Sequence, residues 1–368
     1  MATPLPTEKD QLVQERRSDF DVTNTVRVSS VADVRRTVRS LFEREFPGSA
    51  FDPVWLAFHD FERLYTGRDP EYHAVDTSYH DIQHTLDMTL ALARLIVGHE
   101  RTVAAADRLG PERARFALVV ALFHDAGYIR HRERDRNAVN GAVFTTTHVT
   151  RSGQYLEQYL PRVGLGDFVG VASRVVHFTG YEMPIDEIEL EDPRDTAAGH
   201  LLGTADLLAQ MADRCYLEKC RDRLYPEFVL GDVAVNTSAT GSHAVYQSGR
   251  DLLQKTIDFY QKSAQARLEC SFNRAYRYIE AVSEDGRNPY IRFVRKNMAF
   301  LETIRQAGDW NVLRRRPACV MPDPSGETRV LTLAMRRLRE LSETERENSR
   351  RLKVLDLRTF DPDSPVTN

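Results

Sequence analysis

The feature that most constrains the fold is an almost uniformly apolar block, residues 114–123, which ends in LVVALF and is followed directly by His124 and Asp125. A segment that is apolar on nearly every side is typical of a helix buried at the centre of a bundle. Asp125 would then be buried too, and an ionised carboxylate in an apolar interior is costly unless a counter-charge compensates it. A bound cation is the natural compensation, so the block predicts both a helical core and a candidate metal ligand.

Spacings of three and four between apolar residues predict amphipathic helices along most of the remaining chain. In residues 31–46 these positions are Val31, Val34, Val38, Leu41 and Phe42. Similar patterns extend over residues 56–65, 79–98, 145–160, 167–178, 200–225, 250–282, 288–306 and 330–352. The sequence has no internal repeat and no convincing alternation of period two, so we predict an all-α, or nearly all-α, fold.

The chain of 368 residues is long enough for one large domain with appendages. Its beginning is polar and contains Pro4 and Pro6, and a basic, proline-punctuated stretch precedes the last predicted helix. The expected organisation is a flexible leader at 1–30, a metal-binding core at 31–225, a helical extension packing on the core at 226–310, and a basic linker, charged helix and polar tail at 311–368.

The charge balance excludes several classes of partner. A net charge of −4 and a pI of about 6.3 give no general attraction to nucleic acid or anionic lipid. No apolar run is long enough to span a bilayer, and the four cysteines form no C-x-x-C pair. We expect a cytoplasmic protein without membrane or nucleic-acid partners. Interleaved arginines and glutamates predict that helix 330–352 is solvated or contacts another copy in a homo-oligomer.

Histidines and aspartates recur within the apolar helical patterns. In chain order they are His80, His84, His124, Asp125, His148, His177 and Asp206. Singly, each is more often a core histidine or a hydrogen-bonding carboxylate, but their order across successive helices favours a shared site. Imidazole with carboxylate suits manganese, iron, zinc, cobalt or nickel, whereas carboxylate and water alone suit magnesium. We predict one or two divalent metal ions.

With these residues the sequence resembles the HD-domain superfamily of metal-dependent phosphohydrolases over roughly residues 50–225. The matching stretches are Tyr79-His80-Asp81-Ile82-Gln83-His84, Leu122-Phe123-His124-Asp125-Ala126-Gly127-Tyr128, and Thr204-Ala205-Asp206-Leu207-Leu208, together with His148 and His177. The resemblance implies an HD-domain helical bundle. It also implies that a first metal is held by His84, His124, Asp125 and Asp206. Asp125 would bridge to a second metal held by His148 and His177.

The Tyr-His-x-x-x-His stretch is also similar to the opening motif of cyclic-nucleotide phosphodiesterases, in which the first histidine, here His80, protonates the leaving oxygen. The sequence departs from that group at Asp81, where asparagine is usual, and at Tyr128, where a histidine is expected. His148 and His177 make the second metal site more similar to bacterial members with five histidine and aspartate motifs. A cyclic nucleotide is therefore only one candidate substrate.

The same residues indicate a mechanism. A metal pair bridged by Asp125 would activate a water that attacks phosphorus. His80 lies one helical turn from His84 and is the candidate general acid, although a structural histidine is an equally good interpretation.

Four further residues and one loop complete the predictions. Asp87 and Asp213 would orient ligand imidazoles, although a salt bridge is the commoner role. Arg130, in the basic segment after the His-Asp pair, and Tyr128 would contact the substrate. The acidic loop 179–196 is expected to be solvated.

The predicted function is a metal-dependent phosphohydrolase that cleaves a phosphomonoester or phosphodiester, with a nucleotide-like small molecule as its substrate. Two alternative functions use the same residues. The first is an oxygenase, because some members of the superfamily hold a mixed-valence di-iron pair. The second is a non-catalytic, ligand-binding HD module, and the complete ligand set argues against it.

Overall fold

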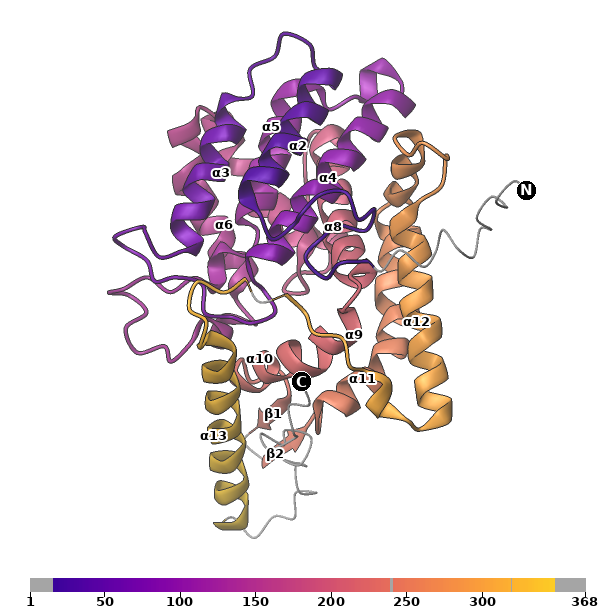
Figure 1. Ribbon diagram of the computed structural model, residues 1–368. Coiled ribbons are helices and arrows are strands. Elements are labelled where there is room, and N and C mark those ends of the chain that lie inside the picture. Colours follow the sequence, from indigo (N-terminus) through magenta and orange to yellow (C-terminus); the bar gives the residue numbers. More distant parts are fainter. Residues whose placement is uncertain (1–15, 239–240, 319, 348–368) are drawn as a thin grey trace, which may run out of the picture.

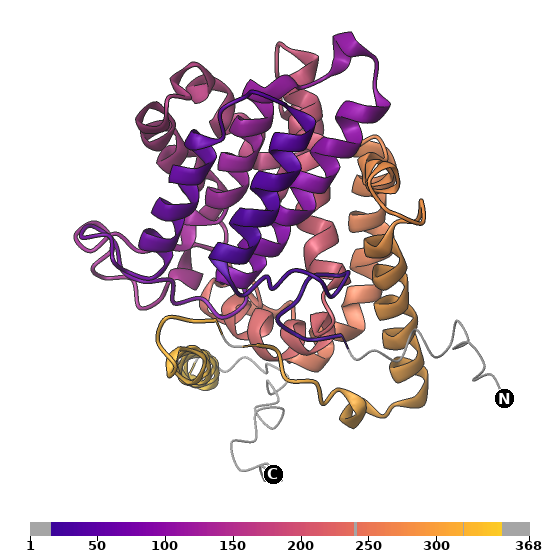
Figure 2. The same ribbon diagram turned by 45° about the horizontal axis from the view of Figure 1, so that its top comes forward.

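The apolar block forms the C-terminal part of α5 (Gly110–Phe123), which is buried from Ala114 to its end. In the computed structural model, which describes residues 16–238, 241–318 and 320–347, α5 packs against two other largely buried helices, α4 (Ile82–Thr102) and α8 (Pro193–Ala212). These three helices also contact one another pairwise and form the centre of the bundle (Figures 1 and 2). The prediction of an all-α fold is confirmed.

Aspartate caps fix where α4 and α8 begin. The Asp81 carboxylate accepts a hydrogen bond from the backbone N–H of His84 at 2.9 Å, and the Asp192 carboxylate accepts one from that of Arg194 at 2.9 Å. Such caps satisfy N–H groups that have no partner within the helix. Each cap therefore sets the position of its helix along the bundle, and with it the positions of His84 and Asp206.

Four amphipathic helices surround this centre. α2 (Val31–Glu45) packs on α4, and α3 (Asp52–Tyr65) packs on α5. α6 (His148–Tyr159) contacts both α5 and α7 (Val169–Val175). The buried residues of α2 follow the predicted spacing and are Val34, Val38 and Phe42.

The C-terminal third adds helices at the side and base of the bundle. α9 (Tyr216–Lys219) and α10 (Tyr225–Leu230) follow α8, and α11 (Gly249–Phe259) leads toward α12 (Pro289–Ala307), which packs along α8. α13 (Gly326–Glu347) packs on α10 (Figure 1). A short antiparallel hairpin, β1 (Val235–Ser238) and β2 (Gly241–Ala244), is an addition that the polar sequence of this region did not predict.

The helix predicted over residues 250–282 is interrupted. α11 ends at Phe259 and continues into two π-helical turns, Tyr260–Ala264 and Arg267–Ser271. Asn273 and Arg274 then adopt left-handed backbone angles, with φ of 48° and 56°. Residues with side chains rarely adopt this conformation, and it cannot continue a right-handed helix.

The prediction of a flexible leader at 1–30 is wrong for residues 16–30, and residues 1–15 lie outside the described part. Asp21 is buried and accepts hydrogen bonds from the backbone N–H groups of Thr25 and Val26, both at 2.9 Å. It also pairs with Arg94 of α4 at 2.7 Å. Burial opposes ionisation, but Arg94 and the hydrogen bonds from Thr23 and Val26 together outweigh it and lower the pKa of Asp21. This buried ion pair holds the segment against the bundle.

The expected boundary between core and extension at residue 225 falls at the first residue of α10. Buried hydrophobic residues form one core that extends from Val22 to Leu338, and α10 contributes Val229 and Leu230 to it. The extension therefore shares its core with the preceding helices. No helix within the described ranges combines the length and apolar character needed to cross a bilayer.

Candidate metal centre

Four predicted ligands meet at the centre of the bundle. His84 comes from the first turn of α4, His124 and Asp125 follow the last residue of α5, and Asp206 lies within α8; all four are buried. His84 Nε2 is 3.2 Å from Asp206 Oδ1 and 3.5 Å from Asp125 Oδ2. His124 Nε2 is 3.1 Å from Asp125 Oδ2. One ligand atom from each of His84, His124 and Asp206 lies within 4.8 Å of the others, so this group could hold a metal ion.

Hydrogen bonds behind the cluster orient its members. His124 Nδ1 lies 2.8 Å from the carbonyl oxygen of Ala121, so Nδ1 carries a proton and Nε2 faces the cluster. Gln210, one turn after Asp206 on α8, donates its side-chain N–H to Asp206 Oδ1 at 2.7 Å. These contacts hold the ligand atoms in position without occupying all of their lone pairs.

Two buried atoms of the cluster, His124 Nε2 and Asp125 Oδ2, form an ion pair at 3.1 Å but accept or donate no well-aligned hydrogen bond among the described residues. Buried polar atoms without such a bond are rare in protein interiors because each forfeits its interactions with water. Both are competent metal ligands, and they face the same place. The donor set therefore fits a divalent ion.

The charges of the cluster depend on one another. Burial opposes protonation of His124, yet the adjacent Asp125 raises the pKa of His124 to about 9. Burial likewise opposes ionisation of Asp125, but His124 holds its pKa well below the usual range. The proton on His124 thus supplies the positive charge that the buried carboxylate needs. A metal ion at the same place would supply that charge instead and would displace the proton.

His148 adjoins the cluster on the other side of Asp125. Its Nε2 lies 3.7 Å from Asp125 Oδ1, and its Nδ1 lies 2.8 Å from the carbonyl oxygen of Thr145. Burial lowers the pKa of His148, which favours the neutral, metal-binding form. Asp125 therefore presents one carboxylate oxygen to His84 and His124 and the other to His148, as a bridging ligand would.

The structure does not bring His177 into this group. Its Nδ1 is buried without a hydrogen-bond partner, and its imidazole forms no ion pair with a carboxylate of the described residues. His177 lies in a short helical turn after α7, where burial lowers its pKa and Glu182 opposes that shift. The predicted second-metal ligand set is thus only partly assembled, through Asp125 and His148.

His80 is held by a carboxylate that the sequence did not single out. His80 Nδ1 lies 2.6 Å from Oε2 of Glu227, a fully buried residue of α10. The other oxygen of Glu227 accepts a hydrogen bond from the backbone N–H of Tyr79. Burial opposes protonation of His80, but Glu227 outweighs it and raises the pKa of His80. With Nδ1 bonded to Glu227, His80 can present only Nε2 to a ligand.

Tyr128 packs against both His80 and His148, whose own rings are 6.0 Å apart. Its ring stacks on the His80 ring at a centroid distance of 4.4 Å and on the His148 ring at 4.4 Å. The contacts do not support the predicted role of Tyr128 in substrate binding: the side chain is only 2% exposed, and two imidazoles pack against its ring. Tyr128 instead fixes the spacing of the two histidines.

The predicted roles of Arg130 and Asp213 are also corrected, whereas that of Asp87 stays a prediction. The Arg130 guanidinium pairs with Asp76 at 2.8 Å and donates to the Ala138 carbonyl oxygen, so it is not free to bind phosphate. Asp213 accepts from Lys219 Nζ at 2.6 Å and from a backbone N–H rather than from an imidazole. Asp87 Oδ1 is buried and unpaired among the described residues, and burial raises the pKa of Asp87 to about 8.

Sequence reasoning missed Glu227 and Glu182. Glu227 lies in YPEFVL, where a charge among apolar residues carries the same signal that identified Asp206. Glu182 belongs to the loop expected to be solvated, yet its carboxylate accepts from the backbone N–H of Val149 at 2.7 Å and lies 3.7 Å from His148 Nδ1. It caps α6 and adds negative charge behind His148.

The fold and site define an all-α protein with a buried imidazole–carboxylate group that could hold a metal ion. No family model, curated protein or solved structure matches the chain. The function must therefore be inferred from the side chains of the site.

Proposed function

We propose that the chain is a metal-dependent phosphohydrolase of the HD-domain superfamily and that it cleaves a phosphomonoester or phosphodiester of a nucleotide-like small molecule. One observation carries the proposal. The metal-binding group lies beside a histidine that is suited to proton transfer: the rings of His80 and His84 are 6.0 Å apart, and a buried carboxylate orients His80.

The residues divide the chemistry between them. A divalent ion bound here lowers the pKa of a coordinated water and neutralises charge on phosphoryl oxygens. His84, His124 and Asp206 hold that ion, and Asp125 extends toward His148. His80 gives its Nδ1 proton to a hydrogen bond with Glu227, and this carboxylate raises the pKa of His80, so the ring also keeps a proton on Nε2 that it can deliver to the leaving oxygen.

The His80–Glu227 pair also separates this proposal from the two alternatives. Hydrolysis of an ester needs a proton for its leaving group, and this pair provides one beside the metal-binding group. A ligand-binding module has no such requirement. A di-iron oxygenase would use the same histidines and aspartates but needs no proton donor for a leaving alcohol, so the His80–Glu227 pair favours hydrolysis.

Reconstitution tests the proposed function directly. The full-length chain, stripped of metal, is reloaded separately with manganese, iron, cobalt, nickel, zinc or magnesium and assayed with phosphomonoesters, cyclic nucleotides, dinucleotides and nucleoside triphosphates. We expect metal-dependent cleavage of at least one class, measured as released phosphate or alcohol. Oxygen uptake by the iron-loaded protein without any phosphoester cleavage would favour the oxygenase, and complete inactivity would favour the binding module.

His80→Ala is expected to retain the metal and lower kcat by roughly a hundredfold to ten-thousandfold, the usual contribution of a general acid. The loss should shrink for a p-nitrophenyl ester, whose leaving group needs little protonation. Glu227→Gln should show the same leaving-group dependence with a smaller loss. The control is His59→Ala, which removes a surface histidine next to Asp60. Loss of metal from the His80 variant would make His80 a ligand instead.

A further inference from the structure

A cavity lined by basic side chains lies apart from the metal centre. It is bounded by the N-terminal segment, α4, the chain after α8, and the first half of α12, and its volume is about 900 Å³. Six cationic side chains line it against two acidic ones, Glu284 and Asp285. The cationic residues are Arg16, Arg94, Arg214, Arg292, Lys296 and Arg315. We call this the basic hollow; none of its lining residues belongs to the metal centre.

Most of these cations form no direct ion pair, and the carboxylates of Asp213, Asp87 and Asp21 act on Arg16 only from a greater distance. Arg94 pairs with Asp21, but the other five form no ion pair with a carboxylate of the described residues. The acidic side chains do not compensate for this excess. Asp285 accepts from the Ser283 hydroxyl at 2.9 Å and from a backbone N–H at 3.0 Å within its own loop. The basic hollow therefore concentrates positive charge on a chain whose net charge is −4.

Neutral groups hold the cations in place. Arg16 donates to the Ala212 carbonyl oxygen at 3.2 Å, and its charge lies 4.0 Å from the centre of the Phe293 ring. Arg292 and Lys296 flank the same ring, at 4.8 and 5.9 Å. Cation–π contacts and carbonyl bonds fix the side chains without cancelling their charge. The arrangement is thus positioned for an anion before any ligand arrives.

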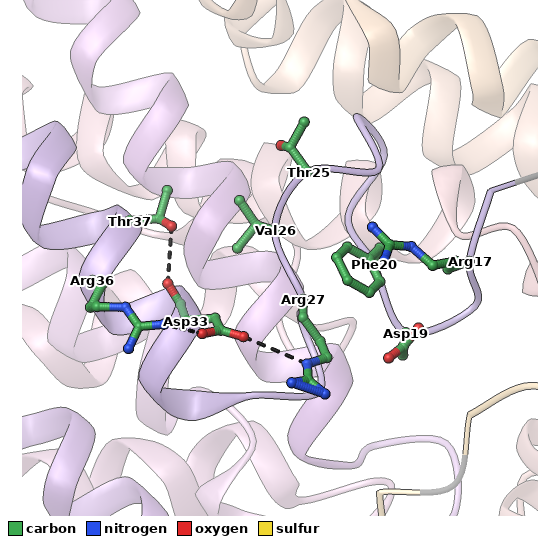
Figure 3. A pocket seen from close by; sticks show the side chains of 9 residues that line it. All are labelled: Arg17, Asp19, Phe20, Thr25, Val26, Arg27, Asp33, Arg36 and Thr37. Atoms are coloured by element: carbon green, nitrogen blue, oxygen red, sulfur yellow. Dashed lines mark hydrogen bonds and ion pairs between the residues drawn. The ribbon is translucent and has the colours of Figure 1, made fainter. Parts of the chain in front are cut away.

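A second hollow is also lined by arginines, but a carboxylate lies among them. It is lined by Arg17, Arg27 and Arg36, and Figure 3 shows Arg27 and Arg36 directed at Asp33. Arg27 lies 3.6 Å from that carboxylate, and Arg36 hydrogen-bonds to it. Arg17 bonds to Asn24 instead, so two of the three arginines in the second hollow share one carboxylate, whereas only one of the six cations in the basic hollow has an ion pair among the described residues.

We propose that the basic hollow binds a small anion carrying two or more phosphate groups. Its volume lies within the range of small-molecule sites, roughly 300–1,000 Å³. Phosphate oxygens accept charge-assisted hydrogen bonds from arginine in a fixed geometry, and several adjacent phosphates would match several adjacent cations. This site is independent of the proposed hydrolysis, because the metal centre contributes nothing to it.

Inorganic triphosphate is the probe, and calorimetric titration of the full-length, metal-free chain at low ionic strength is the measurement. We expect one site per chain. The double variant Arg292→Ala/Lys296→Ala should bind roughly tenfold more weakly or worse, since charge-assisted hydrogen bonds to phosphate are lost. The charge-preserving Arg292→Lys/Lys296→Arg should retain most of the affinity. Both residues are exposed, and circular dichroism checks the fold.

Two controls isolate the site. Arg27→Ala/Arg36→Ala removes the same charge from the second hollow and should leave triphosphate binding unchanged. Asp125→Ala removes a metal-centre residue and should leave it unchanged too. Equal affinity in the wild type and the Arg292/Lys296 double alanine variant overturns the proposal. Tighter binding of citrate than of triphosphate overturns the assignment to phosphate, and tighter, competitive binding of a single-stranded oligonucleotide assigns the surface to nucleic acid instead.

Discussion

Replacing Asp125 with alanine is expected to abolish metal retention and phosphoester cleavage together, while the helical circular dichroism largely persists. Asp125 is the one carboxylate of the group that approaches His84, His124 and His148, at 3.5, 3.1 and 3.7 Å. Its loss removes a ligand and the bridge in a single step. Changing even a partner that only orients a ligand lowers metal affinity about 10- to 100-fold, so loss of the ligand itself should exceed that.

The fold should survive this substitution because the remaining partners stay satisfied. His124 keeps its hydrogen bond to the Ala121 carbonyl oxygen and becomes neutral once Asp125 is gone. Metal content by mass spectrometry, turnover and a metal-induced rise in Tm are the measurements, and the rise should disappear in the variant. Asp60→Ala is the matched control, because His59-Asp60 is the same dipeptide on the surface of α3. Full metal content and activity in Asp125→Ala would refute the site assignment.

The elements that could be predicted are those whose burial pattern lies within one segment. The uniform apolarity of residues 114–123 and the spacing in α2 each report burial locally, and α5 and α2 lie where the pattern placed them. The breaks after Phe259 were missed because left-handed angles at Asn273 and Arg274 depend on the surrounding packing rather than on local sequence.

The same difference between local patterns and distant contacts separates the site residues that could be predicted from those that could not. His84, His124, Asp125 and Asp206 were identifiable because each places a polar side chain in an apolar helix or at its end, and the structure brings them together. Arg130 was misinterpreted because its partner, Asp76, lies 54 residues earlier in the chain. Sequence patterns show that a residue is buried or charged, whereas a partner distant in the chain decides what it does.

Gly127→Ala is expected to destabilise the fold, although alanine in place of glycine usually stabilises a protein by about 0.4–1 kcal/mol where the backbone allows it. Gly127 does not have a positive φ, so its backbone conformation suits alanine. The obstacle is space: an added Cβ would lie 1.9 Å from the carbonyl oxygen of His148 and 2.9 Å from Cβ of Arg151. Because the nearest atom is backbone, α6 must move as a unit.

That movement would reach the metal centre. The Gly127 N–H donates to the Ser152 hydroxyl at 2.9 Å, and its carbonyl oxygen accepts from Arg151 at 2.8 Å, so displacement of α6 strains both bonds and carries His148 away from Asp125. Overpacking of this kind lowers the free energy of unfolding by about 1–3 kcal/mol. Urea denaturation measures it, with Gly170→Ala on α7 as the control, since no atom outside its own stretch of helix lies within 4 Å of its added Cβ. The control should be neutral or stabilised; equal behaviour of the two variants would show that α6 is not packed tightly on the His-Asp turn.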